Sequence, residues 1–343
     1  MKPAVDLNIS NPLKIGLIGC GRAAEVNYLR ALNKIPDAKV VAVVDPIKKR
    51  RELLSKKLNN CNNYISLGSN LAGGTTGPIQ QVDAAIITTP PDTHIPLASE
   101  FLKRDKFVLI EKPLAPSTKG IKELLSIEAS SKASLMMGFN HRYWKPVIDL
   151  KDKLFIHPKI DLVEMIFTSN YNKWNPVSYS SDPLDDLGPH VFDLIRYIFK
   201  KEIVSISANK LDKNILDLKI KISEEIQVLC HIAHSNESIR SIKVETNDKK
   251  YHINHKSVRI SSKYRSIRKF FDLGDRVKRI VLRQTSPIKN TYEMQLKNFI
   301  NLIRLNIPAD PNIEDGVAAI LAVEATQKSI SKRGREIYLN EIK

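Results

Sequence analysis

A histidine and two carboxylates lie within eight residues of this chain and can do acid–base chemistry. The segment runs from Asp186 to Asp193, with His190 between them, directly before the apolar stretch 194–199. If a helix begins near Leu187, Asp186 lies at its start, and His190 and Asp193 are three positions apart on nearby turns. An imidazole held in this way can accept a proton from a substrate, so the segment predicts a general base.

A lysine far upstream supplies a second reactive group. Lys112 stands in Glu111-Lys112-Pro113, at the end of an apolar strand over residues 108–110. An ammonium and an imidazole that converge on one hydroxyl can polarise it and remove its proton. With a dinucleotide turn in the same chain, Lys112 and His190 predict hydride transfer from an alcohol.

A glycine turn follows the first apolar run of the chain. Gly19-x-Gly21-x-x-Ala24 comes directly after the strand expected over residues 13–18 and opens a helical stretch. In such a fingerprint the first glycine permits a tight turn and the second lets the backbone approach a pyrophosphate. The third small residue keeps helix and strand close. The turn therefore predicts a Rossmann dinucleotide site.

Asp45 ends the second expected strand, where a carboxylate can accept hydrogen bonds from the adenosine ribose. It would repel a 2′-phosphate, so NAD(H) is favoured over NADP(H). The basic run 48–51 keeps NADP(H) as an alternative. The residues expected to bind the dinucleotide in this region are Gly19, Gly21, Arg22, Ala24 and Asp45.

Thr89 and Pro90 lie at the carboxyl end of a further expected strand, 82–88, where open parallel sheets bind ligands. They are expected to shape the wall around the nicotinamide ribose. His94 is grouped with these cofactor residues by its position, although packing within the first turn of the next helix is the favoured interpretation.

The periodicity of the chain changes near residue 159. Up to residue 138 strands alternate with helices, which predicts an α/β, doubly wound parallel sheet. Residues 214–222 then alternate strictly between apolar and polar, and three more short strands follow at 226–234, 239–245 and 249–254. This pattern predicts an open, predominantly antiparallel sheet, followed by helices over 291–305 and 315–331. We expect a Rossmann domain over 1–138 and a substrate-binding and oligomerisation domain over 139–343.

Composition excludes several classes of protein. The chain has 343 residues and 42% hydrophobic residues, which is ample for two cores, but no apolar run long enough for a membrane span. Cys20, Cys61 and Cys230 form neither a metal pattern nor a disulfide framework, so no metal is expected. Residues 1–6 lack the apolar run of a signal peptide, and we expect a cytoplasmic protein.

The formal charge of +17 is concentrated in one segment. Residues 255–290 contain eleven Lys and Arg against two Asp, with apolar residues at roughly helical spacing. A solvated helix packed on its own sheet is the favoured interpretation. A wall for a phosphorylated or nucleotide-linked substrate is the second, and docking on an anionic membrane or a partner protein is the third. Nucleic acid is the least favoured, because no recognition motif accompanies the charge.

Several motifs occur in one order along the chain. They are the glycine turn, Thr89-Pro90-Pro91-x-x-His94, Glu111-Lys112-Pro113, the run Gly-Phe-Asn-His-Arg-Tyr at 138–143, and Asp186-x-Gly188-x-His190-x-x-Asp193. In this order they resemble the glucose–fructose oxidoreductase / inositol dehydrogenase / MocA (GFO/IDH/MocA) family of NAD(P)-dependent oxidoreductases. Residues 292–299 and 314–316 resemble the closing helices of that family, so the resemblance covers nearly the whole chain.

The resemblance implies roles for the matching residues. Lys112 matches the family lysine that binds the reacting hydroxyl and contacts the nicotinamide ribose, and Glu111 before it is grouped with the cofactor-binding residues. Pro113 matches a proline that is often preceded by a cis peptide. His190 matches the acid/base, and Asp186 matches the acidic residue that positions substrate or histidine.

Arg142 matches a position near the entrance of the substrate domain whose role is less fixed, and we expect Arg142 and the adjacent Tyr143 to contact substrate. Two departures from the family pattern stand out. Asn27 replaces a histidine found in many members, and residues 180–183 (Ser-Ser-Asp-Pro) replace a glycine-rich stretch. The first departure affects cofactor packing, and the second predicts an altered rim of the substrate site.

These observations predict reversible oxidation of a secondary hydroxyl on a sugar, a nucleotide sugar or a cyclitol, with a nucleotide-linked sugar preferred. A homo-oligomer, dimer or tetramer, is expected to form through the open sheet. Two alternatives remain. One is a relative that cleaves a glycosidic bond through transient hydride transfer, and the other is a non-catalytic dinucleotide sensor, which would have no need of Lys112 or His190.

Overall fold

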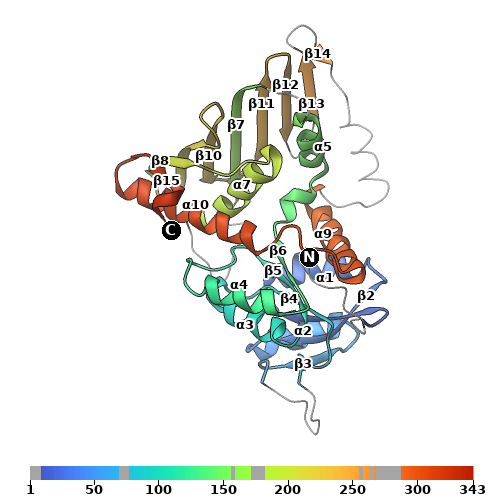
Figure 1. Cartoon of the computed structure of the whole chain (residues 1–343). Helices are drawn as coiled ribbons and strands as arrows, with labels where there is room; N and C mark the ends of the chain where they lie inside the picture. Colours follow the sequence, from blue (N-terminus) through green and yellow to red (C-terminus); the bar gives the residue numbers. More distant parts are fainter. Residues whose placement is uncertain are drawn as a thin grey trace. The chain divides into compact units, whose positions relative to one another are not determined.

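The computed structural model divides the chain into two compact units (Figure 1). The first contains Met1–Asn140 and Tyr292–Val317, and the second contains His141–Thr291 and Ala318–Lys343. The boundary expected from the sequence, at residue 138, places every later residue in the second domain. In the structure, residues 292–317 instead belong to the first unit. The structure describes residues 9–68, 77–155, 159–170, 182–254, 258–262, 266–267 and 287–342.

The first unit is built on a six-stranded parallel sheet in the order β3-β2-β1-β4-β5-β6. This is the doubly wound Rossmann topology, as the alternation of strands and helices predicted. The strands are β1 (Leu13–Ile18), β2 (Ala38–Val44), β3 (Asn62–Tyr64), β4 (Ala84–Ile87), β5 (Phe107–Glu111) and β6 (Leu135–Gly138). Only β3 was not expected, because it has three residues, two of them asparagine.

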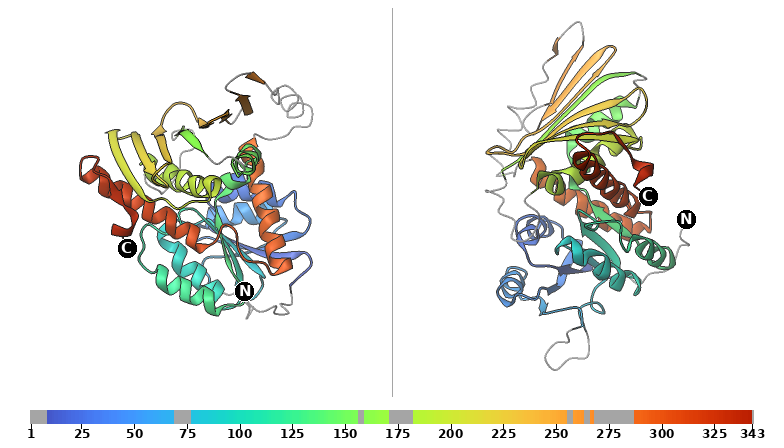
Figure 2. Two further views of the ribbon diagram at one scale, coloured as in Figure 1. Left: turned by 45° about the horizontal axis from the view of Figure 1, so that its top comes forward. Right: turned by 90° about the vertical axis from the view of Figure 1, so that its left-hand side faces the viewer.

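Helices connect these strands. The connecting helices are η1 (Ala24–Tyr28), α1 (Leu29–Leu32), α2 (Lys48–Lys57), η2 (Pro91–Thr93), α3 (His94–Leu102) and α4 (Ile121–Ser130). The later helices of the chain are α9 (Pro287–Leu305) and α10 (Ile313–Ser331), and η4 (Leu339–Glu341) closes it. Figure 2 shows α3 and α4 side by side, and their buried faces pack apolar residues such as Phe101 and Leu124.

The second unit is built on a nine-stranded sheet in the order β14-β13-β12-β11-β7-β10-β9-β8-β15. Among the described strands, every pairing is antiparallel except that of β7 with β10, so the predicted open, predominantly antiparallel sheet is confirmed. Its longer strands are β7 (Ile160–Ser169), β8 (Ser205–Asp212), β9 (Ile215–Lys221), β10 (Gln227–His234), β11 (Arg240–Thr246) and β12 (Lys249–Asn254). Its shorter strands are β13 (Val258–Ser262), β14 (Ser266–Ile267) and β15 (Ile337–Tyr338).

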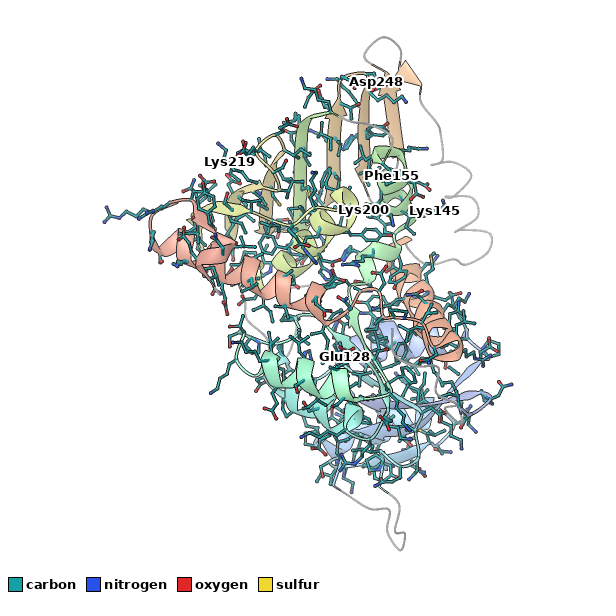
Figure 3. All side chains as sticks on the ribbon, in the orientation of Figure 1. Glu128, Lys145, Phe155, Lys200, Lys219 and Asp248 are labelled. Carbon is teal, nitrogen blue, oxygen red and sulfur yellow. The ribbon has the colours of Figure 1, made fainter. Side chains whose placement is uncertain are left out.

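Helices cover one face of this sheet, and no helix within the described residues covers the other. Helices α5 (Lys145–Leu154) and α7 (Pro183–Phe199), with residues 318–331 of α10, cover the apolar face, where one core joins helix residues such as Phe192 to strand residues such as Phe167. Where α5 and α7 end, the Lys200 ammonium lies 4.8 Å from the ring centre of Phe155 (Figure 3). The opposite face carries polar residues at alternate positions, among them Lys219.

The expected basic helix lies almost entirely outside the described residues. Ile267, which was assigned to it from helical spacing, instead belongs to strand β14, paired with Ile260 of β13. Among the described helices, none combines the length and apolarity needed to cross a bilayer.

Candidate functional site

The glycine turn begins directly after β1 and has the geometry that a pyrophosphate site needs. Gly19 has φ +91°, and a Cβ there would lie 2.9 Å from the Thr89 methyl carbon, so only glycine fits. A Cβ on Gly21 would meet no described atom within 4 Å, which leaves the backbone open to a phosphate. Ala24 is buried and begins η1, a short π-helical turn of a kind that is frequent at functional sites. These residues fit a dinucleotide.

Asp45 is buried at the end of β2, where its carboxylate joins two loops. Oδ2 accepts a hydrogen bond from the Cys20 amide at 2.8 Å, and Oδ1 accepts one from the Ile47 amide at 2.7 Å. Each carboxylate oxygen has a second lone pair for a ribose hydroxyl. Burial and the Asp45 charge raise the pKa of the Cys20 thiol to about 12, so that thiol stays protonated. Asp45 thus shapes the turn as well as offering acceptors.

The loop after β4 is tied to the glycine turn. The Thr88 hydroxyl donates to the Gly19 carbonyl at 2.8 Å, and the Thr93 hydroxyl contacts the Thr89 hydroxyl at 2.7 Å. Pro90 precedes η2 and adopts extended backbone. Thr89 and Pro90 therefore lie beside the turn at the carboxyl ends of β1 and β4, as expected for residues around a bound dinucleotide.

His94 holds two of these loops together. Its side chain is fully buried, with Nδ1 2.8 Å from the Pro113 carbonyl and Nε2 2.9 Å from the Thr89 carbonyl. Burial lowers its pKa, so the ring is neutral and donates to one carbonyl at a time. Both ring nitrogens face the protein, which agrees with the favoured interpretation of a packed histidine. Any contribution to cofactor binding comes through the loops that it holds.

Lys112 directly follows β5, where the backbone is anchored from both sides. The peptide bond to Pro113 is cis. The Glu111 carboxylate accepts a hydrogen bond from the Lys112 amide at 3.1 Å and another from the Tyr28 hydroxyl of η1 at 2.8 Å. Burial raises the pKa of Glu111, and the Tyr28 ring packs edge-on against Tyr292 at 5.3 Å. Glu111 is thus a buried anchor for the lysine.

Helix α7 begins earlier than the expected Leu187. It starts at Pro183, because Asp182 caps it by accepting a hydrogen bond from the Leu184 amide at 2.9 Å. Asparagine or aspartate before proline is a strong N-terminal signal, and Pro189 lies inside the helix rather than at its start. The expectation of a start at Leu187 was therefore wrong.

Asp186 consequently lies in the first turn of α7, and three residues missed by the sequence analysis surround it. Its carboxylate accepts a hydrogen bond from the Ser169 hydroxyl at 3.0 Å and lies 3.5 Å from Nε2 of His234. Arg240 donates to the Thr168 and Ile239 carbonyls, and burial lowers its pKa to about 10 while the Asp186 charge opposes this. A carboxylate, an imidazole, a hydroxyl and a guanidinium are thus gathered together.

These three residues mark the ends of adjacent strands. Ser169 ends β7, His234 ends β10 and Arg240 begins β11, and the strands are neighbours in the order β11-β7-β10. Each residue looks ordinary in the sequence. The signal that would have found them is the strand order, which no local pattern reveals.

His190 and Asp193, on the next turn of α7, pair with a short helix, η3 (Asn140–Tyr143). His190 Nδ1 lies 3.0 Å from His141 Nδ1, and Arg142 makes hydrogen bonds of 2.6–3.0 Å to both carboxylate oxygens of Asp193. The Arg142 guanidinium also lies 5.1 Å from the ring centre of Tyr197. The Arg142 guanidinium is therefore hydrogen-bonded to a carboxylate of the protein itself. Tyr143, half-buried at the end of η3, stays a predicted substrate contact.

The described residues thus form two half-sites. The first unit contains the glycine turn, Asp45, Thr89 and Lys112, and the second contains Asp186 and His190. The fold and the first half-site together define a dinucleotide-binding protein of the Rossmann class.

Comparison with known proteins refines that class. Residues 13–139 match the model of an oxidoreductase family with an NAD-binding Rossmann fold. Inositol 2-dehydrogenase of Rhizobium meliloti (strain 1021) is 26% identical over 334 residues, which cover 94% of this chain and 98% of that protein. The rhizopine catabolism protein MocA of Rhizobium meliloti is 21% identical over 329 residues, which cover 93% and 95%.

A solved structure shows the same fold over both units. The structure of scyllo-inositol dehydrogenase from Lactobacillus casei with bound NAD(H) and scyllo-inositol matches with a TM-score of 0.76 at 18% identity, over 96% of this chain and 99% of that one. Residues 13–139 thus form an NAD-binding Rossmann domain of the GFO/IDH/MocA oxidoreductase family, as the motif order indicated, and the chain is similar to inositol 2-dehydrogenase of that family over nearly its whole length.

Proposed function

We propose that this chain is an NAD-dependent dehydrogenase that oxidises a secondary hydroxyl of a cyclitol or sugar reversibly. The observation that carries the proposal is the pairing of two half-sites in one chain. An anchored lysine follows β5 beside a dinucleotide turn, and a buried histidine stands one helical turn from a polar cluster.

The residues divide the chemistry between them. The Lys112 ammonium polarises the substrate oxygen, and His190 accepts the hydroxyl proton as the O–H bond breaks. NAD, when bound, supplies the hydride acceptor for the carbon that carries this oxygen. In the reverse direction His190 returns the proton and Lys112 stabilises the developing alkoxide.

The polar cluster of the second unit fits a polyhydroxylated substrate. We assign the binding of the neighbouring hydroxyls to the cluster Asp186, Ser169, His234 and Arg240. Its carboxylate accepts hydrogen bonds from hydroxyls, its guanidinium donates to them, and its imidazole can donate with one ring nitrogen and accept with the other. A site built from hydrogen-bonding groups rejects analogues that lack a hydroxyl, because its buried polar groups would then be unpaired. Cyclitols and sugars both present the required rows of hydroxyls.

The names of the full-length relatives favour a cyclitol over the nucleotide-linked sugar that the basic segment suggested. Most of that segment, including residues 268–286, lies outside the described residues, so the nucleotide sugar stays as the alternative. The triple substitution of Arg276, Lys278 and Arg279 by glutamine distinguishes the two. It should raise KM for a phosphorylated or nucleotide-linked substrate at low salt, where screening is weak, and leave KM for a neutral cyclitol unchanged.

The principal test is NADH formation with a panel of inositols, free sugars and nucleotide sugars. A dehydrogenase releases one NADH for each alcohol oxidised, and NADP in place of NAD should give slower turnover. Product formed without net NADH would instead indicate transient hydride transfer in glycoside cleavage. Binding of NAD with no turnover on any alcohol would favour a sensor.

We also propose a homo-oligomer that forms through the uncovered face of the nine-stranded sheet. Leu229 of β10 is 42% exposed there, beside cross-strand ion pairs such as Lys243 with Glu164 at 3.0 Å. An apolar centre with a charged rim is typical of a protein interface. Light scattering of the purified chain tests this, and Leu229→Lys should shift the mass toward a monomer.

The three free cysteines are compatible with a reducing, cytoplasmic location.

A further inference from the structure

His141 and His190 form a buried side-chain pair within the second unit. Their Nδ1 atoms lie 3.0 Å apart, and the ring centres are 4.2 Å apart with planes at 71°. The His141 ring also lies 6.2 Å from the ring centre of Phe167. At this nitrogen–nitrogen distance one ring donates a hydrogen bond and the other accepts it.

Charged and titratable groups from each neighbouring element surround this pair. On α7, Asp186 precedes His190 by one turn and Asp193 follows it by three positions, and His234 of β10 lies beside Asp186. On η3, Arg142 neutralises Asp193. Nδ1 of His190 shares its hydrogen bond with the neighbouring imidazole of His141.

We propose that His141 is a positioning residue that holds His190 in the tautomer with its proton on Nδ1, so that proton transfer takes place at Nε2. This inference rests on the proposed function of His190 as the base. In this arrangement His190 Nδ1–H donates to the lone pair on His141 Nδ1, and His141 carries its own proton on Nε2. The same hydrogen bond persists after His190 Nε2 has accepted the substrate proton, so the pair serves both directions of the reaction.

If the hydrogen bond ran in the opposite direction, with His141 as the donor, His190 could not act as the base. If His141 donated, the neutral His190 ring would carry its proton on Nε2 and could accept none from a hydroxyl there. A neutral imidazole partner also differs from a carboxylate in its effect, because an anion beside His190 would favour the imidazolium. His141 therefore fixes the orientation of His190 and adds no negative charge beside it.

Nuclear magnetic resonance of histidine-labelled protein tests the tautomer without any substrate. Long-range proton–nitrogen spectra distinguish protonated from unprotonated ring nitrogens, and the His190→Gln variant assigns the signals of His190. We expect a proton on Nδ1 of His190 in the unaltered protein and in His141→Asn, whose side-chain oxygen can accept in place of Nδ1. In His141→Leu, which has similar bulk and no acceptor, the proton should move to Nε2. A proton on Nε2 in the unaltered protein, or an unchanged tautomer in His141→Leu, would overturn the inference.

Kinetics on the same two variants tests the consequence. Removing a general base costs about 10²- to 10⁴-fold, so His141→Leu should lower kcat by part of that, at least about 10-fold, with KM nearly unchanged. His141→Asn should recover most of the loss, and thermal unfolding of both variants shows whether the fold is intact. Equal kcat in all three folded proteins would overturn the inference. If no alcohol is oxidised by any of them, the proposed function fails, and the tautomer measurement alone decides the pairing.

Discussion

The two half-sites hold their functional residues in different ways. In the first unit, polar side chains bind backbone groups: the Asp45 carboxylate binds two amides, His94 lies between two carbonyls, and Glu111 binds the amide of the lysine that it precedes. In the second unit, side chains bind other side chains across about fifty residues of sequence, as His141 binds His190 and Arg142 binds Asp193.

This difference has a physical consequence. Backbone amides and carbonyls are present at every position, so loops anchored on them depend on few particular partners. A pair of buried side chains needs both members, because removal of one leaves the other unsatisfied in a low-dielectric interior. Removal of the Lys112 side chain, whose anchor Glu111 binds the backbone amide, should therefore cost activity but little stability, whereas removal of one member of a buried side-chain pair should cost both.

The largest expected effect concerns Lys112. Lys112→Ala should reduce turnover by about 10²- to 10⁴-fold, because it removes the group that polarises the substrate oxygen. Since Glu111 binds the amide of this residue and not its side chain, the loop should keep its shape and NAD should bind nearly as before. Steady-state kinetics with NAD titration checks both points. Turnover within a factor of two of the unaltered protein would remove Lys112 from the mechanism.

His190→Ala should lower the oxidation rate by a similar factor at neutral pH. The loss should be smaller at high pH, where hydroxide can replace the base. In the unaltered protein, oxidation should fall as the pH drops through the range in which imidazoles titrate, because a protonated ring cannot accept the substrate proton. The measurement is a pH profile of kcat, with a deuterated substrate to show that hydride transfer limits the rate. A flat profile under those conditions would exclude His190 as the base.

The Arg142–Asp193 pair gives the sharpest test of stability. Both side chains are buried, at 6% and 1% exposure, so Arg142→Ala should lower the free energy of unfolding by about 3–5 kcal/mol by leaving a buried carboxylate unpaired. Arg196→Ala, on the helix α7 that carries Asp193, is the matched control. Its partner Glu202 is 71% exposed, so that change should cost at most about 1 kcal/mol.

Denaturant unfolding of both variants measures the difference. Equal losses of unfolding free energy in Arg142→Ala and Arg196→Ala would show that burial does not set the contribution of these two ion pairs to stability. The double variant Arg142→Met with Asp193→Leu should recover stability, because it leaves no buried charge behind. It should not recover activity if the pair also orients α7.

The same comparison explains what the sequence could reveal. Residues 13–24 identify the first half-site because a Rossmann turn needs glycine at fixed spacing, and the chemistry follows from local backbone geometry. His190 and Asp186 were identified from one helix. Ser169, His234 and Arg240 were not, because only the order of strands β11-β7-β10 brings them together.

Competing signals explain the two local errors. The helix start expected near Leu187 overlooked the cap at Asp182-Pro183, where Asp182 accepts a hydrogen bond from the Leu184 amide and proline occupies the first helical position. Helical spacing near Ile267 concealed a short strand, whose register depends on its partner Ile260.

The smallest expected effect concerns the choice of cofactor at Asp45. Asp45→Ala should reduce the preference for NAD over NADP, because it removes a carboxylate that accepts from the ribose hydroxyls and repels a 2′-phosphate. It should also cost about 1–3 kcal/mol of stability, because the buried amides of Cys20 and Ile47 lose their acceptor. Asp45→Asn separates the two effects, since it keeps one acceptor oxygen but carries no charge. If Asp45→Asn retains most of the stability but loses the preference for NAD over NADP, the charge selects the cofactor and the hydrogen bonds hold the turn. Equal affinity of the unaltered protein for NAD and NADP would instead show that the basic residues of α2, where Arg51 already binds the Pro46 carbonyl at 3.2 Å, outweigh Asp45.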